Sequence, residues 1–258
     1  MITAASNSRI KRLVQLNQKS KLRRTEDVFL AEGVKMFLEA PREQLQEVYV
    51  SESFLEKCSC REHLEEVGYE VVSDSVFSKI SDTCTPQGVL CVLKQFHYNI
   101  EEMLRDKAPL FLLLENIQDP GTLGTMLRTG EGAGFSGIIM SRDTVDLYNP
   151  KVIRSTMGSI YRVPFYYADD FAAAVHQVQQ AGVSVYAAHL RGKNSYACQD
   201  YTKGTAFLIG NEGNGLREET AELADCYIRI PMEGKVESLN AAVASSILMY
   251  EAHRQRAI

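Results

Sequence analysis

Three short strings in this sequence combine residue types that could do chemistry. The first, "GAGFSG" at 132–137, fits the G-x-G-x-x-G pattern of dinucleotide-binding turns. The second, "GNEGNG" at 210–215, places the carboxylate of Glu212 among glycines that let a ligand approach the backbone closely. The third, "ESLN" at 237–240, contains the hydroxyl of Ser238 and the amide of Asn240. Each string can act only if strands and helices hold it at a site.

The context of "GAGFSG" argues against a dinucleotide turn. Such a turn leads from a strand into a helix, whose free N–H groups bind the pyrophosphate. Here the helical pattern of "GTLGTMLRTGEGAG" comes first, and the apolar strand "GIIMS" at 137–141 follows. The string is therefore predicted to connect a helix to a strand, with Gly134 as a left-handed cap. This order disfavours a nicotinamide-dependent oxidoreductase with a Rossmann fold.

The second glycine string lies in a better context. It follows the apolar strand "TAFLIG" at 205–210 and precedes a helix expected from about Leu216. The carboxyl end of a parallel strand is where α/β folds place their sites. No Gly-Lys-Ser/Thr follows, so this is not a phosphate loop. The alternatives are an ordinary turn between strand and helix here, and a simple helix N-cap for Ser238.

The elements that must position these strings alternate between strand and helix along the chain. Residues 1–95 predict a small α/β domain, and the polar stretch 96–107 predicts a linker. The strands of the first domain are expected at 28–33, 45–51, 69–73 and 88–94, and the stretch 54–68 is expected to be helical. Residues 108–258 predict a second α/β domain with a mostly parallel sheet, because apolar strands alternate with helical stretches. Its strands are expected at 110–115, 137–141, 163–167, 183–188, 205–210 and 226–231, before a long helix from about Leu239 to Arg256.

Composition sets the class of protein. The chain has 258 residues, 45% of them hydrophobic and 24% charged, which is typical of a globular protein. Its longest apolar runs are shorter than a membrane span and no secretory signal is visible, so a cytoplasmic location without membrane attachment is expected. The six cysteines lack paired C-x-x-C spacing, and no metal site is expected.

The charge is unevenly distributed. A net charge of −5 argues against a protein that coats nucleic acid non-specifically. From Ser8 to Arg24, however, there is no acidic residue and there are seven basic ones: Arg9, Lys11, Arg12, Lys19, Lys21, Arg23 and Arg24. This run is either a solvated helix face or a surface that contacts phosphates.

Taken together, four segments resemble one family. "ENIQDPGTLGTMLRTGEGAGF", "NPKVIRSTMGSIYRVPF", "LIGNEGNGL" and "IPMEGKVESLNAAVASSILMYE" are similar in order and spacing to the SpoU (TrmH-type) RNA ribose 2′-O-methyltransferases of the SPOUT superfamily. The resemblance covers residues 108–256. Residues 1–95 also resemble the substrate-binding domain of many members, a small fold related to ribosomal RNA-binding proteins.

The resemblance implies a fold, a cofactor and partners. It implies a C-terminal domain tied into a deep trefoil knot, a homodimer, and S-adenosylmethionine bound in the knotted loops. The implied substrate is structured RNA, with ribosomal RNA favoured over transfer RNA because of the N-terminal domain. The basic run thereby becomes an expected RNA contact.

The resemblance also assigns residues to roles. The implied cofactor contacts are Gly210, Ile230 and Leu239, with Ala188 and His189 as weaker candidates. The implied catalytic residues are Asn116, Arg128, Glu212, Ser238 and Asn240. The implied RNA contacts are Arg9, Lys11, Arg12, Lys21, Arg23, Arg24, Lys151 and Arg154.

Roles within the implied site stay open at this point. Arg128 is a candidate general base or a group that orients the ribose and its phosphate; a guanidinium group seldom gives up its proton, which favours orientation. Glu212 could orient Arg128 or Asn116, or accept a proton. Thr122 stands where the family more often has Asn. An RNA-binding protein of ribosome assembly that has lost catalysis is the alternative function, and the retained catalytic candidates speak against it.

Overall fold

The structure of the chain, a computed structural model, describes residues 1–257 and divides by packing into two compact units. The first contains Met1–Phe96 and Asp146–Tyr161, and the second contains His97–Val145 and the chain from Arg162 onward. Two segments therefore pack differently from their expected places. The expected linker joins the second unit and carries a helix, and residues 146–161, which lie within the expected C-terminal domain, join the first unit.

The first unit is built on a four-stranded mixed sheet. Its elements are α1 (Ser8–Gln18), α2 (Ser20–Glu26), β1 (Val28–Glu32), α3 (Val34–Leu38), β2 (Leu45–Ser51), α4 (Glu52–Lys57), α5 (Arg61–Val67), β3 (Glu70–Val72), α6 (Asp74–Ile80), β4 (Val89–Lys94), α9 (Pro150–Thr156) and the 3-10 helix η1 (Ser159–Tyr161). The strand order is β1-β4-β2-β3; β4 is antiparallel to both of its neighbours, and β2 is parallel to β3.

The core of the first unit explains why its basic segment folds as a helix. Ile10, Leu13 and Leu16 lie at helical spacing on α1 and are fully buried against α6 and the sheet. The strands predicted in this part are confirmed. The stretch 54–68, predicted to be one helical segment, is instead two helices that end and begin on either side of the Cys58–Cys60 turn.

The second unit is built on a seven-stranded sheet in which all paired strands are parallel. Its elements are α7 (Ile100–Met103), β5 (Leu110–Leu114), α8 (Pro120–Gly132), β6 (Gly137–Ser141), β7 (Phe165–Ala168), α10 (Phe171–Gln180), β8 (Ser184–Ala188), β9 (Asn194–Ser195), the 3-10 helix η2 (Tyr196–Cys198), β10 (Thr205–Ile209), α11 (Glu218–Ala221), β11 (Cys226–Arg229) and α12 (Ala241–Arg256). The strand order is β7-β6-β5-β10-β8-β11-β9.

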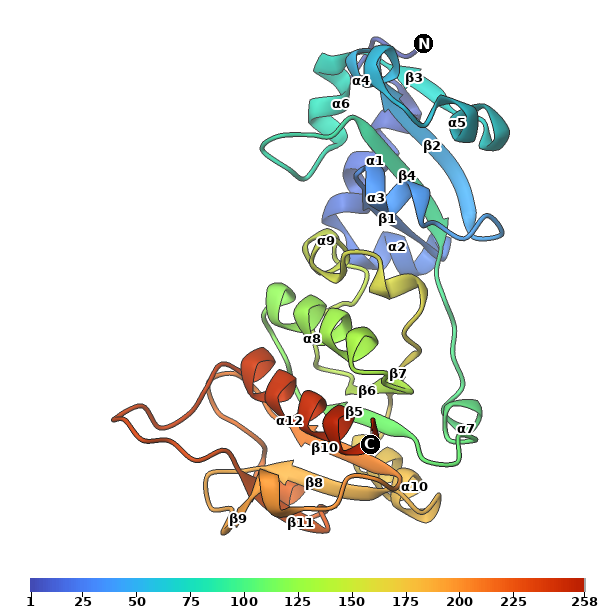
Figure 1. Cartoon of the computed structure of the whole chain (residues 1–258). Helices are drawn as coiled ribbons and strands as arrows, with labels where there is room; N and C mark the ends of the chain where they lie inside the picture. Colours follow the sequence, from blue (N-terminus) through green and yellow to red (C-terminus); the bar gives the residue numbers. More distant parts are fainter. Residues whose placement is uncertain (258) are drawn as a thin grey trace. The chain divides into compact units, whose positions relative to one another are not determined.

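Helices cover this sheet on both faces, as the apolar strands require. Phe111 and Leu113 of β5 pack in one core cluster with Val175 and Val178 of α10. On the sheet's other side α8 and α12 run next to each other (Figure 1), and α12 also contacts β10. Because parallel strands end at the same edge, the loops after β5, β6, β8, β10 and β11 gather there.

The ends of several elements differ from the sequence prediction. The helix expected from Leu216 is the single turn α11, the last helix begins at Ala241 rather than Leu239, and the short strand β9 was not predicted. Gly134 does follow the C-cap of α8 with a φ of +76°, so the helix-to-strand interpretation of "GAGFSG" is confirmed. Across residues 1–257 the structure contains no helix with the length and apolar character of a membrane span.

Candidate active site

A cavity of about 310 Å³ lies in the second unit where the loops after β8, β10 and β11 meet the start of α12. Seven of the residues predicted for the site line it: Ala188, His189, Gly210, Glu212, Ile230, Ser238 and Leu239. These residues come from four separate stretches of sequence. All five predicted cofactor contacts are therefore brought together by the fold.

The glycine loop after β10 is a tight hairpin that turns its backbone toward this cavity. Asn211 and Gly215 exchange two backbone hydrogen bonds of 3.0 and 2.9 Å, and the Asn211 Oδ1 atom accepts from two further N–H groups inside the turn. A Cβ on Gly210 would overlap the backbone of Gly215 and Leu216. The glycine is therefore required by close backbone approach within the loop.

Glu212 connects this loop to the loop that follows β5. Its two carboxylate oxygens accept hydrogen bonds from the backbone N–H groups of Gln118, at 3.1 Å, and Asp119, at 3.0 Å. It contacts neither Arg128 nor the Asn116 side chain through any described hydrogen bond. Its position in the structure is that of a group that fixes the backbone at the start of α8.

Asn116 is held in a left-handed conformation, with φ of 54°. Its N–H donates to Ser141 Oγ at 2.9 Å, and its carbonyl accepts from Asn211 Nδ2 at 2.8 Å. Its side-chain Oδ1 accepts from Gln118 Nε2 at 2.6 Å. Asn is one of the few residues that tolerate this conformation, and such conformations cluster at functional sites.

A network of charged residues around the buried Glu115 adjoins this loop, and sequence reasoning missed it. Glu115 is 1% exposed and accepts hydrogen bonds from the backbone N–H of Arg217, at 2.8 Å, and from the Thr220 hydroxyl. The Arg217 guanidinium bridges Glu115 to Asp143 at the end of β6. Burial raises the pKa of Asp143, but hydrogen bonds from Ser141 and Arg217 outweigh it, and the net pKa is lowered. A charged residue directly after the apolar run "LFLLL" was the available signal.

His189 lies at the rim of the cavity in a defined tautomer. Its Nδ1 atom accepts from the Arg191 N–H at 3.1 Å, so the proton of the neutral ring is on Nε2. The ring centroid is 5.0 Å from that of Tyr227. Partial burial, and then the charge of Arg191, lower the pKa of His189. Both effects favour the neutral form of the ring.

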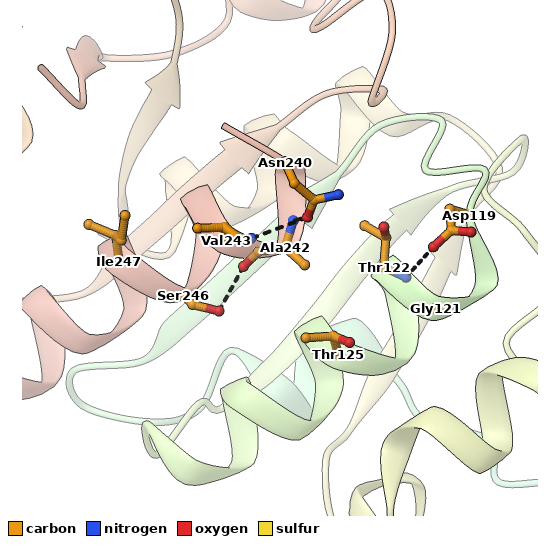
Figure 2. A pocket seen from close by; sticks show the side chains of 9 residues that line it. All are labelled: Asp119, Gly121, Thr122, Thr125, Asn240, Ala242, Val243, Ser246 and Ile247. Carbon is orange, nitrogen blue, oxygen red and sulfur yellow. Dashed lines mark hydrogen bonds between the residues drawn. The ribbon is translucent and has the colours of Figure 1, made fainter. Parts of the chain in front are cut away.

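A second cavity, of about 420 Å³, forms a groove between α8 and α12 (Figure 2). At one end Asp119 caps α8 by accepting from the Thr122 N–H at 2.6 Å, and Asn240 caps α12 by accepting from the Ala242 N–H at 2.9 Å. Asn240, and not Ser238, is thus the N-cap of the last helix. Its Oδ1 atom is committed to that cap.

Arg128 lies apart from both cavities. Its side chain is exposed on α8, it lines neither cavity, and the described residues offer it no hydrogen bond or ion pair. The guanidinium is therefore available to a ligand that reaches α8 from solvent.

The basic residues of the first unit fall into two groups. Arg9 pairs with Glu70 at 2.8 Å, and Arg12 pairs with Glu26 and Glu47 at 2.7 and 2.8 Å. Arg23 is 3% exposed and bonds to the Leu16 carbonyl and Asp146, so the structure corrects its expected role from RNA contact to internal support.

The second group remains exposed. Lys11, Lys21 and Arg24 project from α1 and α2 without a described ion pair, and so does Lys151 from α9. Arg154, also on α9, is exposed but lies 3.3 Å from Asp82.

Comparison with known proteins agrees with this arrangement. The model of the SpoU rRNA Methylase family matches residues 109–250, and the model of the MRM3-like substrate binding domain matches residues 7–91. The 23S rRNA (guanosine(2553)-2′-O)-methyltransferase RlmP of Bacillus subtilis is 32% identical over 252 residues, covering 96% of this chain and 97% of that protein.

Two solved structures match nearly the whole chain. The AdoMet-bound rRNA methyltransferase from Sinorhizobium meliloti is 30% identical, with a TM-score of 0.84 over 98% of this chain and 97% of that one. The SpoU methyltransferase AviRb from Streptomyces viridochromogenes, in complex with AdoMet, is 26% identical, with a TM-score of 0.88 over 97% and 98%. From its sequence and its fold, the chain belongs to the SpoU rRNA methylase family.

Proposed function

We propose that this protein methylates the 2′-hydroxyl of a ribose in structured RNA, with S-adenosylmethionine as the methyl donor and ribosomal RNA as the substrate. The observation that carries the proposal is the junction of two loops. The glycine loop of the cavity and the strained Asn116 loop are joined through Glu212 and Asn211. A cofactor in the cavity would thus lie beside a rigid polar loop at the carboxyl edge of a parallel sheet.

The cavity suits a cofactor recognised largely through backbone groups. We propose that Gly210, Ile230, Leu239, Ala188 and His189 hold S-adenosylmethionine, which supplies a methyl group on a positively charged sulfonium when bound. Support comes from the Gly210 position, where any side chain would overlap the loop backbone. The neutral His189 ring offers a donor at Nε2 without adding positive charge.

The remaining site residues act on the RNA and on each other. We propose that Arg128 orients the ribose and its phosphate, which suits an unpaired planar guanidinium on an exposed helix face. Glu212 acts as a positioning residue through the backbone it binds. Asn116, Ser238 and Asn240 are proposed to contact the substrate, Asn240 through its Nδ2 because its Oδ1 caps α12. In-line positioning supplies most of the rate gain in this scheme.

We propose that residues 1–95 form the RNA-binding domain, related to ribosomal RNA-binding proteins, and that residues 108–258 form the methyltransferase domain. Among the basic residues, the exposed Lys11, Lys21, Arg24 and Lys151 are the favoured phosphate contacts, since their charges are not neutralised by carboxylates. The names of the relatives, which act on 23S rRNA, support ribosomal over transfer RNA.

Three features of the family are carried over as proposals. A trefoil knot in the C-terminal part is supported by the insertion of β10 between β5 and the earlier strand β8. A homodimer is supported by the α8/α12 groove and by the apolar side chains of Val243 and Tyr250, 48% and 49% exposed on α12. A cytoplasmic location stays a prediction.

The decisive experiment is to map 2′-O-methyl groups in total RNA from cells with and without the gene for this protein. We expect one ribosomal RNA position to lose its methyl group and to regain it when the wild-type protein is restored. An unchanged map, together with calorimetry that shows no binding of S-adenosylmethionine, would contradict the proposal.

A further inference from the structure

We propose that Gln118 is a positioning residue for methyl transfer: it fixes the side-chain amide of Asn116 so that its Nδ2 donor, and not its oxygen, faces the substrate. This inference rests on the proposed function and adds a residue to it. The interaction that carries it is a side-chain amide held between two acceptors. Gln118 Nε2 donates to the Asp143 backbone carbonyl at 2.5 Å and to Asn116 Oδ1 at 2.6 Å.

The Gln118 amide has two ends, and either could face Asp143. Oxygen and nitrogen of an amide have the same shape, so the hydrogen-bond partners must decide. The Asp143 carbonyl can only accept a hydrogen bond. The Gln118 atom beside it is therefore nitrogen, and one of its two hydrogens is used there. Its backbone N–H donates to Glu212, which fixes the main chain from which this side chain extends.

The orientation of the Gln118 amide in turn fixes that of the Asn116 amide. The other hydrogen of Gln118 Nε2 needs an acceptor, so the Asn116 atom facing it is Oδ1. The N–H and carbonyl of Asn116 are held by Ser141 and Asn211, which leaves rotation of the amide as the remaining freedom. Gln118 removes that freedom. Within residues 1–257 no partner is described for Asn116 Nδ2.

The chemistry open to Asn116 depends on which end of its amide faces the substrate. An amide NH₂ group can donate to an oxygen of the ribose or phosphate and hold it, but it cannot take the hydroxyl proton. A flipped Asn116 would offer an acceptor instead, and a donor aimed at the reacting group would be lost. Loss of one oriented hydrogen bond in a site costs on the order of tenfold to a hundredfold in rate.

The test is a double-mutant cycle on the full-length protein with its RNA. Gln118→Met removes the side-chain hydrogen bonds, and Gln118→Glu replaces the donor by an acceptor that attracts Asn116 Nδ2. We expect kcat to fall about tenfold in Gln118→Met and further in Gln118→Glu, while the affinity for S-adenosylmethionine changes less than twofold. In an Asn116→Ala background, Gln118→Met should have no further effect.

Controls separate this role from a structural one. Gln180→Met, at an exposed glutamine ending α10, should leave kcat unchanged, and thermal unfolding of each variant should stay near that of the wild type. An active wild type whose kcat is unchanged by Gln118→Met, or falls equally in the Asn116→Ala background, would overturn the inference alone. A wild-type protein that methylates no RNA would overturn the proposed function, and the inference with it.

Discussion

At the scale of single residues, the site is organised by hydrogen bonds to backbone atoms. Glu212 binds two N–H groups, Asn211 binds the Asn116 carbonyl, and Asn240 caps a helix. Several side chains that the family resemblance marks as catalytic are thus also structural. Arg128 is different, because it has no described partner in the chain and its charge remains available.

This difference leads to a test of how Arg128 acts. If its planar guanidinium orients the ribose and phosphate, Arg128→Ala and Arg128→Lys should both lower kcat, on the order of a hundredfold for Ala. Affinity for S-adenosylmethionine should stay unchanged, because Arg128 does not line the cavity proposed to hold it. Single-turnover methyl transfer to RNA measures the first, and calorimetry the second. Since lysine gives up a proton more readily than arginine, full activity of Arg128→Lys would instead favour a general base.

At the scale of elements, α1 and α2 show that a run of positive charge in sequence is not one surface in space. Arg9 and Arg12 are paired with glutamates, and Arg23 is inside the unit. Release of counterions from RNA depends on cations that are free to meet phosphates. The paired arginines should therefore contribute little to it.

The salt dependence of RNA binding should separate the two groups. Lys21→Gln is expected to reduce the slope of log affinity against log salt by about 0.7 to 0.9, the loss of one phosphate contact. Arg12→Gln is expected to leave this slope unchanged, because its charge is already matched by Glu26 and Glu47. Titrations of RNA at several salt concentrations measure both. Equal slopes in the two variants would contradict the distinction between paired and unpaired basic residues.

The glycine loop is a second element with a testable requirement. Gly210→Ala should destabilise the protein by about 1–3 kcal/mol and weaken S-adenosylmethionine binding, because the new Cβ overlaps the returning backbone. Thermal unfolding and calorimetry measure these effects. Gly213→Ala in the same loop is the stability control, since its nearest contact would be 3.5 Å away. Comparable destabilisation by both variants would argue against a steric cause.

At the scale of the whole molecule, the end of the last helix is hydrogen-bonded to two other segments of the second unit. The Arg256 guanidinium donates to the carbonyls of Tyr201, at 2.7 Å, and Ala108, at 2.8 Å, and also reaches those of Pro109 and Lys203. Burial lowers the pKa of Arg256. One side chain therefore ties α12 to the segments that precede β5 and β10.

Loss of the Arg256 hydrogen bonds should lower global stability. Arg256→Leu is expected to cost about 1–3 kcal/mol of unfolding free energy, because four carbonyl groups, two of them on the buried residues Tyr201 and Pro109, lose a charged donor. Denaturant unfolding measures the change. Arg254→Leu, which loses only the pair between an exposed guanidinium and Glu251, should cost less than about 1 kcal/mol. A larger loss of unfolding free energy in Arg254→Leu than in Arg256→Leu would show that the Arg256 hydrogen bonds are not the source of stability.

Much of the fold was predictable because its signals are local. Apolar runs of strand length predicted β5, β6, β8 and β10, and the order of helix and strand around Gly134 argued against a dinucleotide turn. The residues predicted to contact the cofactor line one cavity together, and the sequence could mark them because they lie within short strings. Gln118, Ser141 and Asp143 were missed because their roles depend on partners from other segments.

By itself, then, the sequence determined most of the elements, the glycine loops and the family, because periodicity and turn chemistry act over a few residues. Only the tertiary structure decided which side chains meet. The pairing of β10 with β5 brings Glu212 to the N–H of Gln118, 94 residues away in the sequence. The tertiary structure also places Arg23 in the interior and residues 146–161 with the first unit. These outcomes depend on burial and on long-range pairing of strands, which no local pattern records.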